Sequence, residues 1–170
     1  MNYLVIFNPN AANGTAVNKV DAVRSNLDNF SLDYELVFTE GPFHATEIAG
    51  KAMGKYDAVV TVGGDGTANE AINGLVQTGK KAENLPCFGM ICCGRGNDFA
   101  YGVGIPKDLE EACSILNAGA TRLIDIGRIT GPEVTEARYF GNGIGIGFDT
   151  VVGLEASKIK WAQGFLGYLL

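Results

Sequence analysis

Residues 58 to 70 of this chain decide its fold, and they read Ala-Val-Val-Thr-Val-Gly-Gly-Asp-Gly-Thr-Ala-Asn-Glu. The run 58–62 is short, apolar and rich in β-branched side chains, which predicts a buried strand. The glycines at positions 63, 64 and 66 favour a sharp turn with an open backbone, because a Cβ would hinder such a turn. We therefore expect a buried strand that ends in a glycine-rich turn.

The helix after this turn is predicted to begin at Thr67. Thr67 and Glu70 have the S/T-x-x-E spacing of a capping box, in which side chains bond the unpaired N–H groups of a helix start. The remaining N–H groups and the positive end of the helix dipole point at one place, which makes an anion site. Asp65 lies within the turn, and its carboxylate would repel a bare phosphate, so the pattern indicates Mg²⁺ or proton transfer. The stretch is thus typical of a nucleotide-phosphate site.

A simpler interpretation is a glycine turn between a strand and a helix, with Asp65 as an ordinary turn residue. The glycines alone do not separate the two interpretations, because glycine-rich turns of this kind are common. The stretch is neither the dinucleotide pattern G-x-G-x-x-G nor the Walker pattern that ends in G-K-[ST]. The full string 63–67, between an apolar strand and a helix, is more specific than its glycines.

Strand patterns and amphipathic helix patterns alternate over residues 1–120. The expected strands are 3–7, 34–39, 58–62 and 87–92, and the expected helices are 16–27, 45–53, 67–76 and 108–117. Such alternation predicts an α/β domain of three layers, a parallel sheet with helices on both faces. Ligands of these sheets bind at the carboxyl ends of the strands. Asn8, Thr39, Gly63 and Gly94 follow those ends, so four loops should converge on one crevice.

The pattern changes beyond this first domain. Two extended runs, 121–129 and 138–146, flank a polar turn and predict an antiparallel pair. Residues 153–170 have a helical pattern with broad apolar faces. The chain stops on Leu170 within apolar sequence, whereas a natural terminus is usually more polar, so we expect 121–170 to be a truncated second domain. Exposed aromatic side chains in such a segment would favour self-association into a homo-oligomer.

Composition limits the class of protein. The net charge is −6, which argues against nucleic-acid binding, since such proteins present a basic face. Four cysteines without a C-x-x-C pair, together with a single histidine, argue against a zinc site. The sequence shows no signal peptide and no run of about 18 apolar residues. We therefore expect a cytoplasmic protein with free thiols and no transmembrane segment.

Gly63-Gly64-Asp65-Gly66-Thr67 resembles the signature shared by diacylglycerol kinases, sphingosine kinases, NAD kinases and, more distantly, phosphofructokinases. The similarity to bacterial diacylglycerol kinase-like lipid kinases extends over nearly the whole chain. The matching motifs are Asn8-Pro9-Asn10 with Gly14, Thr39 with His44-Ala45, the stretch 63–75, Gly94 with Asn97-Asp98-Phe99-Ala100, Ile124-Asp125-Ile126-Gly127, and Phe140-Gly141-Asn142 with Gly147-Phe148-Asp149. NAD kinases share the central signature but not the Asn-Asp-Phe-Ala motif, which favours the lipid kinases.

The resemblance implies an ATP-dependent kinase that transfers the γ-phosphoryl group to a lipid hydroxyl, such as that of diacylglycerol, with Mg²⁺ as cofactor. The lipid would be met at a membrane surface, where the protein would be peripheral. Residues 121–170 would begin the family's antiparallel β-sandwich domain. The residues implied in nucleotide binding are Asn8, Thr39, Gly63, Gly64, Asp65, Gly66, Thr67, Ala68, Asn69 and Arg95, and the implied Mg²⁺ ligand is Asp65.

Two departures from the family pattern leave alternatives open. Cys92 stands where the fourth motif usually has proline, and Arg95 stands where it has a nucleotide-contacting threonine. The arginine either pairs with a phosphate in a bidentate manner or fills the space that the nucleotide needs. The family's general base and structural Mg²⁺ ligands lie late in its second domain, so the base is expected beyond residue 170. The alternatives are an NAD kinase-like enzyme with a soluble substrate and a non-catalytic nucleotide-binding or regulatory protein.

Overall fold

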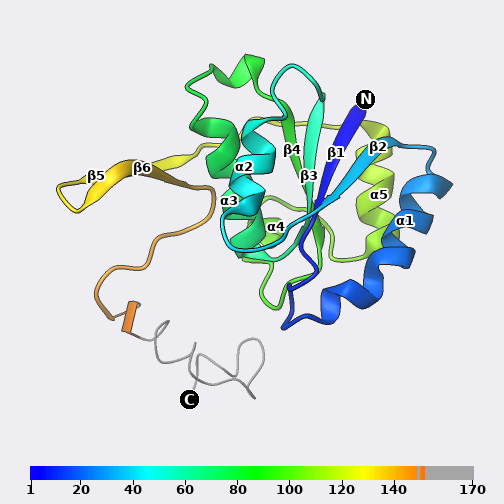
Figure 1. Ribbon diagram of the computed structural model, residues 1–170, viewed down its shortest axis with the longest axis horizontal. Helices are drawn as coiled ribbons and strands as arrows, with labels where there is room; N and C mark the ends of the chain where they lie inside the picture. Colours follow the sequence, from blue (N-terminus) through cyan, green and yellow to red (C-terminus); the bar gives the residue numbers. More distant parts are fainter. Residues whose placement is uncertain (149, 152–170) are drawn as a thin grey trace.

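A parallel sheet of four strands, in the order β2-β1-β3-β4, forms the centre of the molecule (Figure 1). The computed structural model describes residues 1–148, 150 and 151. The strands are β1 (Asn2–Phe7), β2 (Asp33–Phe38), β3 (Ala58–Gly63) and β4 (Cys87–Cys92). All four predicted strands are confirmed, and each neighbouring pair is parallel. The predicted helix over 153–170 lies outside the described residues.

Helices cover both faces of this sheet, so the predicted three-layer α/β fold is confirmed. Because alternate strand residues point to opposite faces, Val5 packs with Val23 and Cys113 on one side, and Leu4 packs with Ala71 on the other. The helices are the 3₁₀ helix η1 (Thr15–Lys19), α1 (Val20–Asn29), α2 (His44–Gly50), α3 (Asp65–Val76), the 3₁₀ helix η2 (Ala82–Asn84), α4 (Asp98–Gly102) and α5 (Leu109–Ala118). None of the helices in the described part of the chain has the length and apolar character needed to span a bilayer.

Helix α3 is enclosed by the sheet on one side and by α2 on another. Ala71 and Leu75 pack on the sheet in the core that also holds the alanines of α2. Gly74 makes the close approach of the two helices possible, because a Cβ at this position would lie only 2.2 Å from the carbonyl oxygen of Thr46. The helix that follows the glycine-rich turn is therefore held rigidly in place.

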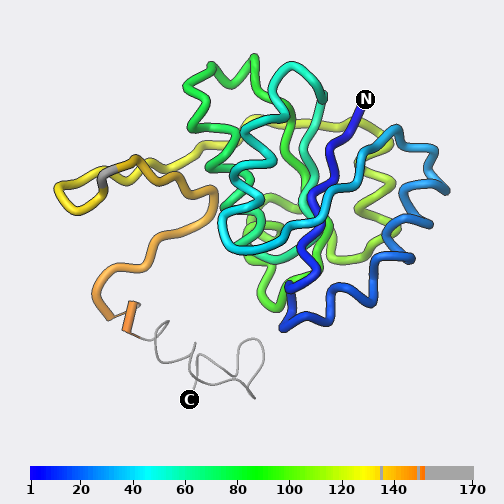
Figure 2. Tube along the Cα trace, viewed as in Figure 1, coloured from blue at the N-terminus to red at the C-terminus, as the bar shows by residue number. Residues whose placement is uncertain are grey.

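An antiparallel hairpin projects beside this layer (Figure 2). Its strands are β5 (Gly127–Gly131) and β6 (Val134–Phe140), and Gly127 pairs with Phe140. The predicted antiparallel pairing is confirmed, but the predicted bounds are wrong: 121–126 and 141–146 contain no strand, and both strands extend into the predicted turn, which is reduced to 132–133. Glycine at every second position from 141 to 147 weakens the tendency of that run to form a strand. The β-sandwich domain over 121–170, and the boundary at residue 120, stay predictions.

Candidate functional site

The loops that follow the strands meet at the carboxyl edge of the sheet, as predicted (Figure 1). Backbone hydrogen bonds tie two of these loops to the neighbouring strand ends. The N–H of Asn8 donates to the carbonyl oxygen of Val62 at 2.9 Å, and the N–H of Thr39 donates to that of Phe7 at 2.9 Å. The first residue of each loop is thus placed by the sheet itself.

Helix α3 begins earlier than predicted, at Asp65, and the capping box does not form. The predicted start at Thr67 is therefore wrong. Thr67 Oγ1 accepts a hydrogen bond from Asn8 Nδ2 at 2.8 Å, and the carboxylate of Glu70 accepts one from the N–H of Ala45 at 3.3 Å. Both side chains bond partners on other elements, and a local sequence pattern contains no information about such partners.

The first turn of α3 is left without a cap. No side chain of the described chain accepts a hydrogen bond from its backbone N–H groups, and the first helical N–H with a described partner is that of Ala68, which donates to Gly64 O at 3.0 Å. The N–H groups of Asp65, Gly66 and Thr67 have no hydrogen-bond acceptor among the described residues. Such groups, at the positive end of the helix dipole, favour a bound anion.

Gly63 and Gly64 are required by space and not by backbone conformation, because a Cβ would lie 2.6 Å from Thr67 Oγ1 and 3.0 Å from the Cα of Gly94, respectively. Gly63, Gly64 and Gly66 all lie outside the left-handed region, so the expected reason for these glycines was incomplete. A Cβ on Gly94 would lie 2.3 Å from the Cα of Gly64, so the two glycine loops touch backbone to backbone. A Cβ on Gly66 would meet no described atom within 4 Å. Gly66 therefore borders open space at the first turn of α3.

Asp65 connects the two glycine loops through its carboxylate. Its Oδ2 accepts the N–H of Asn97 at 2.8 Å, and its Oδ1 accepts the N–H of Phe99 at 2.9 Å. Asn97 is buried at φ +62° and accepts the N–H of Gly94 through its own Oδ1 at 3.1 Å. Asp65 thus holds the start of α4 against the start of α3, a role that the sequence analysis did not predict. Each carboxylate oxygen keeps further lone-pair capacity for a ligand.

A second carboxylate, which was not predicted as a site residue, lies beside Asp65. A Cβ on Gly96 would lie 3.1 Å from Asp65 Oδ2 and 3.4 Å from Asp98 Oδ2, so both carboxylates border the same glycine. The sequence could have indicated Asp98 as a site residue, because it ends the glycine loop after β4. The described ranges contain no group of three or more His, Cys, Asp or Glu residues that could hold a metal ion. A divalent ion here would need further ligands from phosphates and water, an arrangement that Mg²⁺ commonly adopts.

The other predicted site residues have different surroundings. Thr39 and Ala68 are buried, whereas Arg95 is exposed on the loop between β4 and α4. No ion pair of the Arg95 guanidinium is formed within the described ranges. Asn69 faces the hairpin, and its Nδ2 donates to the carbonyl oxygen of Tyr139 at 3.0 Å. The side-chain amide of Asn69 is therefore engaged with β6.

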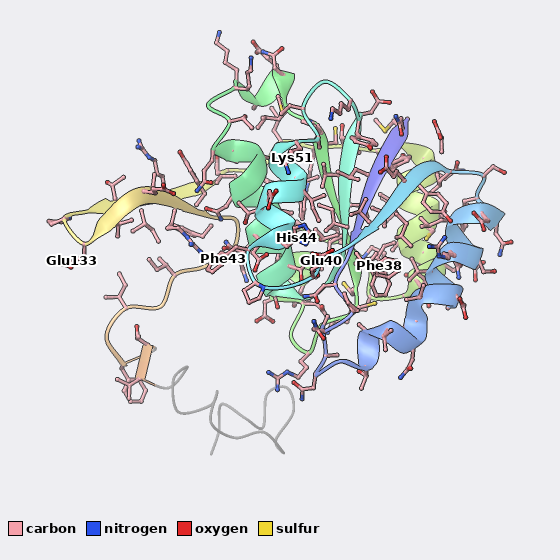
Figure 3. The ribbon with its side chains drawn as sticks, viewed as in Figure 1. Phe38, Glu40, Phe43, His44, Lys51 and Glu133 are labelled. Carbon is pink, nitrogen blue, oxygen red and sulfur yellow. The ribbon has the colours of Figure 1, made fainter. Side chains whose placement is uncertain are left out.

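The loop between β2 and α2 extends from the carboxyl edge of the sheet toward the hairpin. The N–H of Glu40 donates to Nδ1 of His44 at 3.0 Å, which braces the loop (Figure 3). Phe43 has φ +64° and a side chain that is 62% exposed. The guanidinium of Arg138, on β6, lies 5.8 Å from the centroid of the Phe43 ring. The loop that begins at Thr39 therefore contacts β6.

The thiols at the end of β4 are not poised for nucleophilic chemistry. Burial, and secondarily the neighbouring Cys93, raise the pKa of Cys92 above its usual value. Burial also raises the pKa of Cys93. Because the thiolate is the reactive form, both side chains stay protonated and unreactive near neutral pH.

The fold and this site define a parallel α/β domain whose two glycine-rich loops touch at the carboxyl edge of the sheet. Within that class, residues 2–129 match the family model of the diacylglycerol kinase catalytic domain. The chain belongs to this family.

Curated relatives agree with this assignment. The chain is 33% identical over 98% of its length to a diacylglycerol kinase of Bacillus subtilis (strain 168), of which it covers 52%. It is 31% identical over 96% of its length to a diacylglycerol kinase of Mycobacterium tuberculosis, of which it covers 51%. The chain thus spans about half the length of these relatives.

Solved structures agree with the fold. Two structures from Bacillus anthracis str. Sterne superpose with TM-scores of 0.64 and 0.59, at 27% sequence identity and over 74% of this chain. The second is described as a diacylglycerol kinase, and this chain covers 42% of it.

Proposed function

We propose that this chain supplies the nucleotide-binding part of a lipid kinase, which transfers the γ-phosphoryl group of ATP to a lipid hydroxyl such as that of diacylglycerol. The observation that carries the proposal is the uncapped first turn of α3, where Gly66 borders open space at the carboxyl edge of the sheet. Membership of the diacylglycerol kinase catalytic family supports the reaction class.

The nucleotide phosphates would be held by the backbone of this first turn. The free N–H groups of Asp65, Gly66 and Thr67 would donate to phosphate oxygens, and the helix dipole would favour their negative charge. Gly66 would admit the phosphate because it lacks the Cβ that would otherwise occupy the approach. Arg95, exposed on the facing loop, would add a bidentate contact to a phosphate.

The residues beside the first turn would complete the nucleotide site. Gly63 and Gly64 form the approach to the helix, and buried Ala68 closes its first turn with a hydrogen bond to Gly64. Asn8 and Thr39 stand on the two loops that the sheet fixes at the same edge. The side-chain amide of Asn69 is bonded to β6. We include Asn69 in the nucleotide site only because the family resemblance implies it.

The residues present fit a divalent cation that is shared with the nucleotide. The carboxylates of Asp65 and Asp98 border Gly96, and one or two carboxylates with phosphate oxygens are usual ligands of Mg²⁺. Bound Mg²⁺ would neutralise the charge that develops on the transferred group. The hydrogen bonds from Asn97 and Phe99 would orient the Asp65 carboxylate toward that position.

The acceptor would be a lipid presented from a membrane surface. Catalysis of phosphoryl transfer depends on positioning and charge neutralisation, and the carboxylates and the helix start would serve both needs on the nucleotide side. An NAD-type acceptor is the second candidate, and the two are separated by which acceptor becomes phosphorylated from MgATP.

The test is a calorimetric titration of the chain with MgATP, with Gly66→Ala as the informative variant. The new methyl group meets no described protein atom, and alanine favours a helix over glycine by up to about 1 kcal/mol, so thermal stability should hold or rise. Loss of a charge-assisted hydrogen bond, worth about 1.5–3 kcal/mol, should weaken MgATP binding by about tenfold or more.

Gly131→Ala is the matched control, because Gly131 in the hairpin also has open space around its Cβ position and no left-handed φ. It should leave the MgATP affinity unchanged. Equal MgATP affinities for wild type and Gly66→Ala would contradict the placement of the phosphates at this turn. Absence of MgATP binding to a folded wild-type chain would reject the nucleotide-site proposal altogether.

A further inference from the structure

The hairpin is docked on α3 by the backbone of β6. The N–H of Tyr139 donates to Asn73 Oδ1 at 2.9 Å, and its carbonyl oxygen accepts Asn73 Nδ2 at 2.8 Å. One side-chain amide thus bonds both backbone groups of a strand residue, as the backbone of a neighbouring strand would. Asn69 Nδ2 also donates to the Tyr139 carbonyl at 3.0 Å, and Gln77 Nε2 donates to that of Ala137 at 3.3 Å.

These amides form a row on one face of the helix. Asn69, Asn73 and Gln77 are spaced four residues apart, so they lie one above the other. Asn73 is the centre of the row and only 3% exposed, and its Nδ2 also donates to the carbonyl oxygen of Asn69 at 2.8 Å. A buried amide with three such bonds accepts only one alignment of the strand, because any slip leaves buried polar groups unpaired.

The same helix carries the phosphate-binding turn at its start. At a rise of about 1.5 Å per residue, Asn69 lies about 6 Å and Asn73 about 12 Å along the axis from Asp65. A slip of β6 by one residue would move the strand by about 3.3 Å and turn its side chains to the opposite face. Reacting groups in enzymes tolerate far less, since an error of about 1 Å can cost about a hundredfold in rate.

A second contact on β6 supports a defined alignment. Arg138, adjacent to Tyr139, holds its guanidinium 5.8 Å from the centroid of the Phe43 ring on the loop after β2. Figure 3 shows Phe43 on the side of α2 that faces the hairpin. Phe43 keeps a left-handed backbone at φ +64°, a conformation that is unfavourable for a residue with a side chain. This contact would be lost if β6 shifted along α3.

We propose that Asn73 is a positioning residue, which sets the register of β6 on α3 and so holds the second part of the chain at a fixed place relative to the phosphate-binding end of that helix. The inference rests on the function proposed above, because it makes α3 the common reference for nucleotide and acceptor. Asn73 itself touches neither substrate.

The test compares Asn73→Asp with wild type by amide hydrogen exchange of the hairpin, corrected for the intrinsic effect of pH. The substitution keeps the acceptor for the Tyr139 N–H but turns the donor into a carboxylate oxygen that faces the carbonyls of Tyr139 and Asn69. At pH 8 we expect the β5–β6 amides to exchange about tenfold faster or more. At pH 5 the buried carboxyl, whose pKa burial raises, regains a proton to donate, and protection should recover.

Two controls separate register from folding. Asn26→Asp makes the same change at an exposed amide that donates within α1, to Ala22 O at 2.9 Å, and should leave the hairpin protected at both pH values. Tyr139→Pro removes the N–H that Asn73 accepts without altering α3, whereas Tyr139→Ala keeps it. The proline variant should lose hairpin protection and the alanine variant should keep it.

The affinity for MgATP, measured on the same proteins, distinguishes this inference from the proposed function. If Asn73 positions the hairpin, the MgATP dissociation constant should stay within about twofold of wild type while the hairpin is released. Unchanged hairpin protection in both Asn73→Asp and Tyr139→Pro would overturn the proposal, and so would a parallel loss of MgATP affinity. A wild type that binds no MgATP would reject the proposed function, yet the exchange data would still decide whether Asn73 fixes the register.

Discussion

Gly94→Ala should separate the two glycine loops that touch at the carboxyl edge of the sheet. The new Cβ would lie 2.3 Å from the Cα of Gly64 and 2.8 Å from Asn97 Oδ1. Carbon atoms in contact prefer about 3.5–4.0 Å, so the loops must move apart by more than about 1 Å. The obstacle is backbone, which cannot rotate away as a side chain can.

The cost can be estimated from what this movement breaks. Overpacking of this kind costs about 1–3 kcal/mol, and the displaced loop also carries the N–H groups of Asn97 and Phe99 away from the Asp65 carboxylate. Hydrogen bonds to a charged group contribute about 1.5–3 kcal/mol each. If the loop keeps part of these bonds, the free energy of unfolding should fall by about 3 kcal/mol, which corresponds to a decrease in Tm of about 6–12 °C for a chain of this size.

Urea unfolding followed by circular dichroism would measure this change. Gly64→Ala is a graded comparison, because its Cβ would lie 3.0 Å from the Cα of Gly94, and it should destabilise less than Gly94→Ala. Gly131→Ala, in open space, should stay within about 0.5 kcal/mol of wild type. A Gly94→Ala protein as stable as Gly131→Ala would refute the close contact of the two loops.

Two further predictions concern buried groups. Thr61 is fully buried on β3, and its Oγ1 has no hydrogen-bond partner among the described residues. The isosteric Thr61→Val should therefore leave the free energy of unfolding unchanged or raise it by about 1 kcal/mol. A loss above about 1 kcal/mol in urea unfolding would mean that this hydroxyl has a partner. Burial raises the pKa of Cys113 from 9.0 to about 11. The buried, protonated thiol therefore contributes its full stability below pH 9. As pH rises toward 11 the thiol ionises more readily in the unfolded chain, and the free energy of unfolding falls by about 2–3 kcal/mol at most. Cys113→Ala should therefore show a flatter decline of stability between pH 9 and 11, and equal slopes for the two proteins would contradict the raised pKa.

The sequence alone was sufficient to predict the four strands of the parallel sheet. Its four strands are short apolar runs separated by helices, and burial on both faces of a parallel sheet imposes such runs directly. The edge that the loops share follows from that topology, so the sequence alone could place Asn8, Thr39, Gly63 and Gly94 at one edge of the sheet. The Gly-Gly-Asp-Gly-Thr string, together with the Asn-Asp-Phe-Ala motif, was likewise enough to indicate the family that residues 2–129 match.

The start of α3 was decided by tertiary contacts. Thr67 and Glu70 have the spacing of a capping box, yet each bonds a different element, Asn8 on one side and Ala45 on the other. A spacing rule describes only neighbours in sequence, whereas these partners come from the loop after β1 and from α2, which the fold brings together. Leaving the first turn uncapped is what makes it available to an anion.

The reasons for the glycines and for Asn73 also belong to the tertiary structure. The contact of Gly64 with Gly94 and that of Gly74 with Thr46 depend on distances across the fold, which composition and periodicity do not encode. The sequence indicates only that Asn73 is a polar residue within a helix. The docking of β6 is what makes its side chain a paired, buried amide. The sequence by itself determined which elements form and which edge they share, because those depend on local pattern and burial. The tertiary structure decided which polar groups are paired and which are left free, because each hydrogen bond needs a partner that the chain supplies from far away.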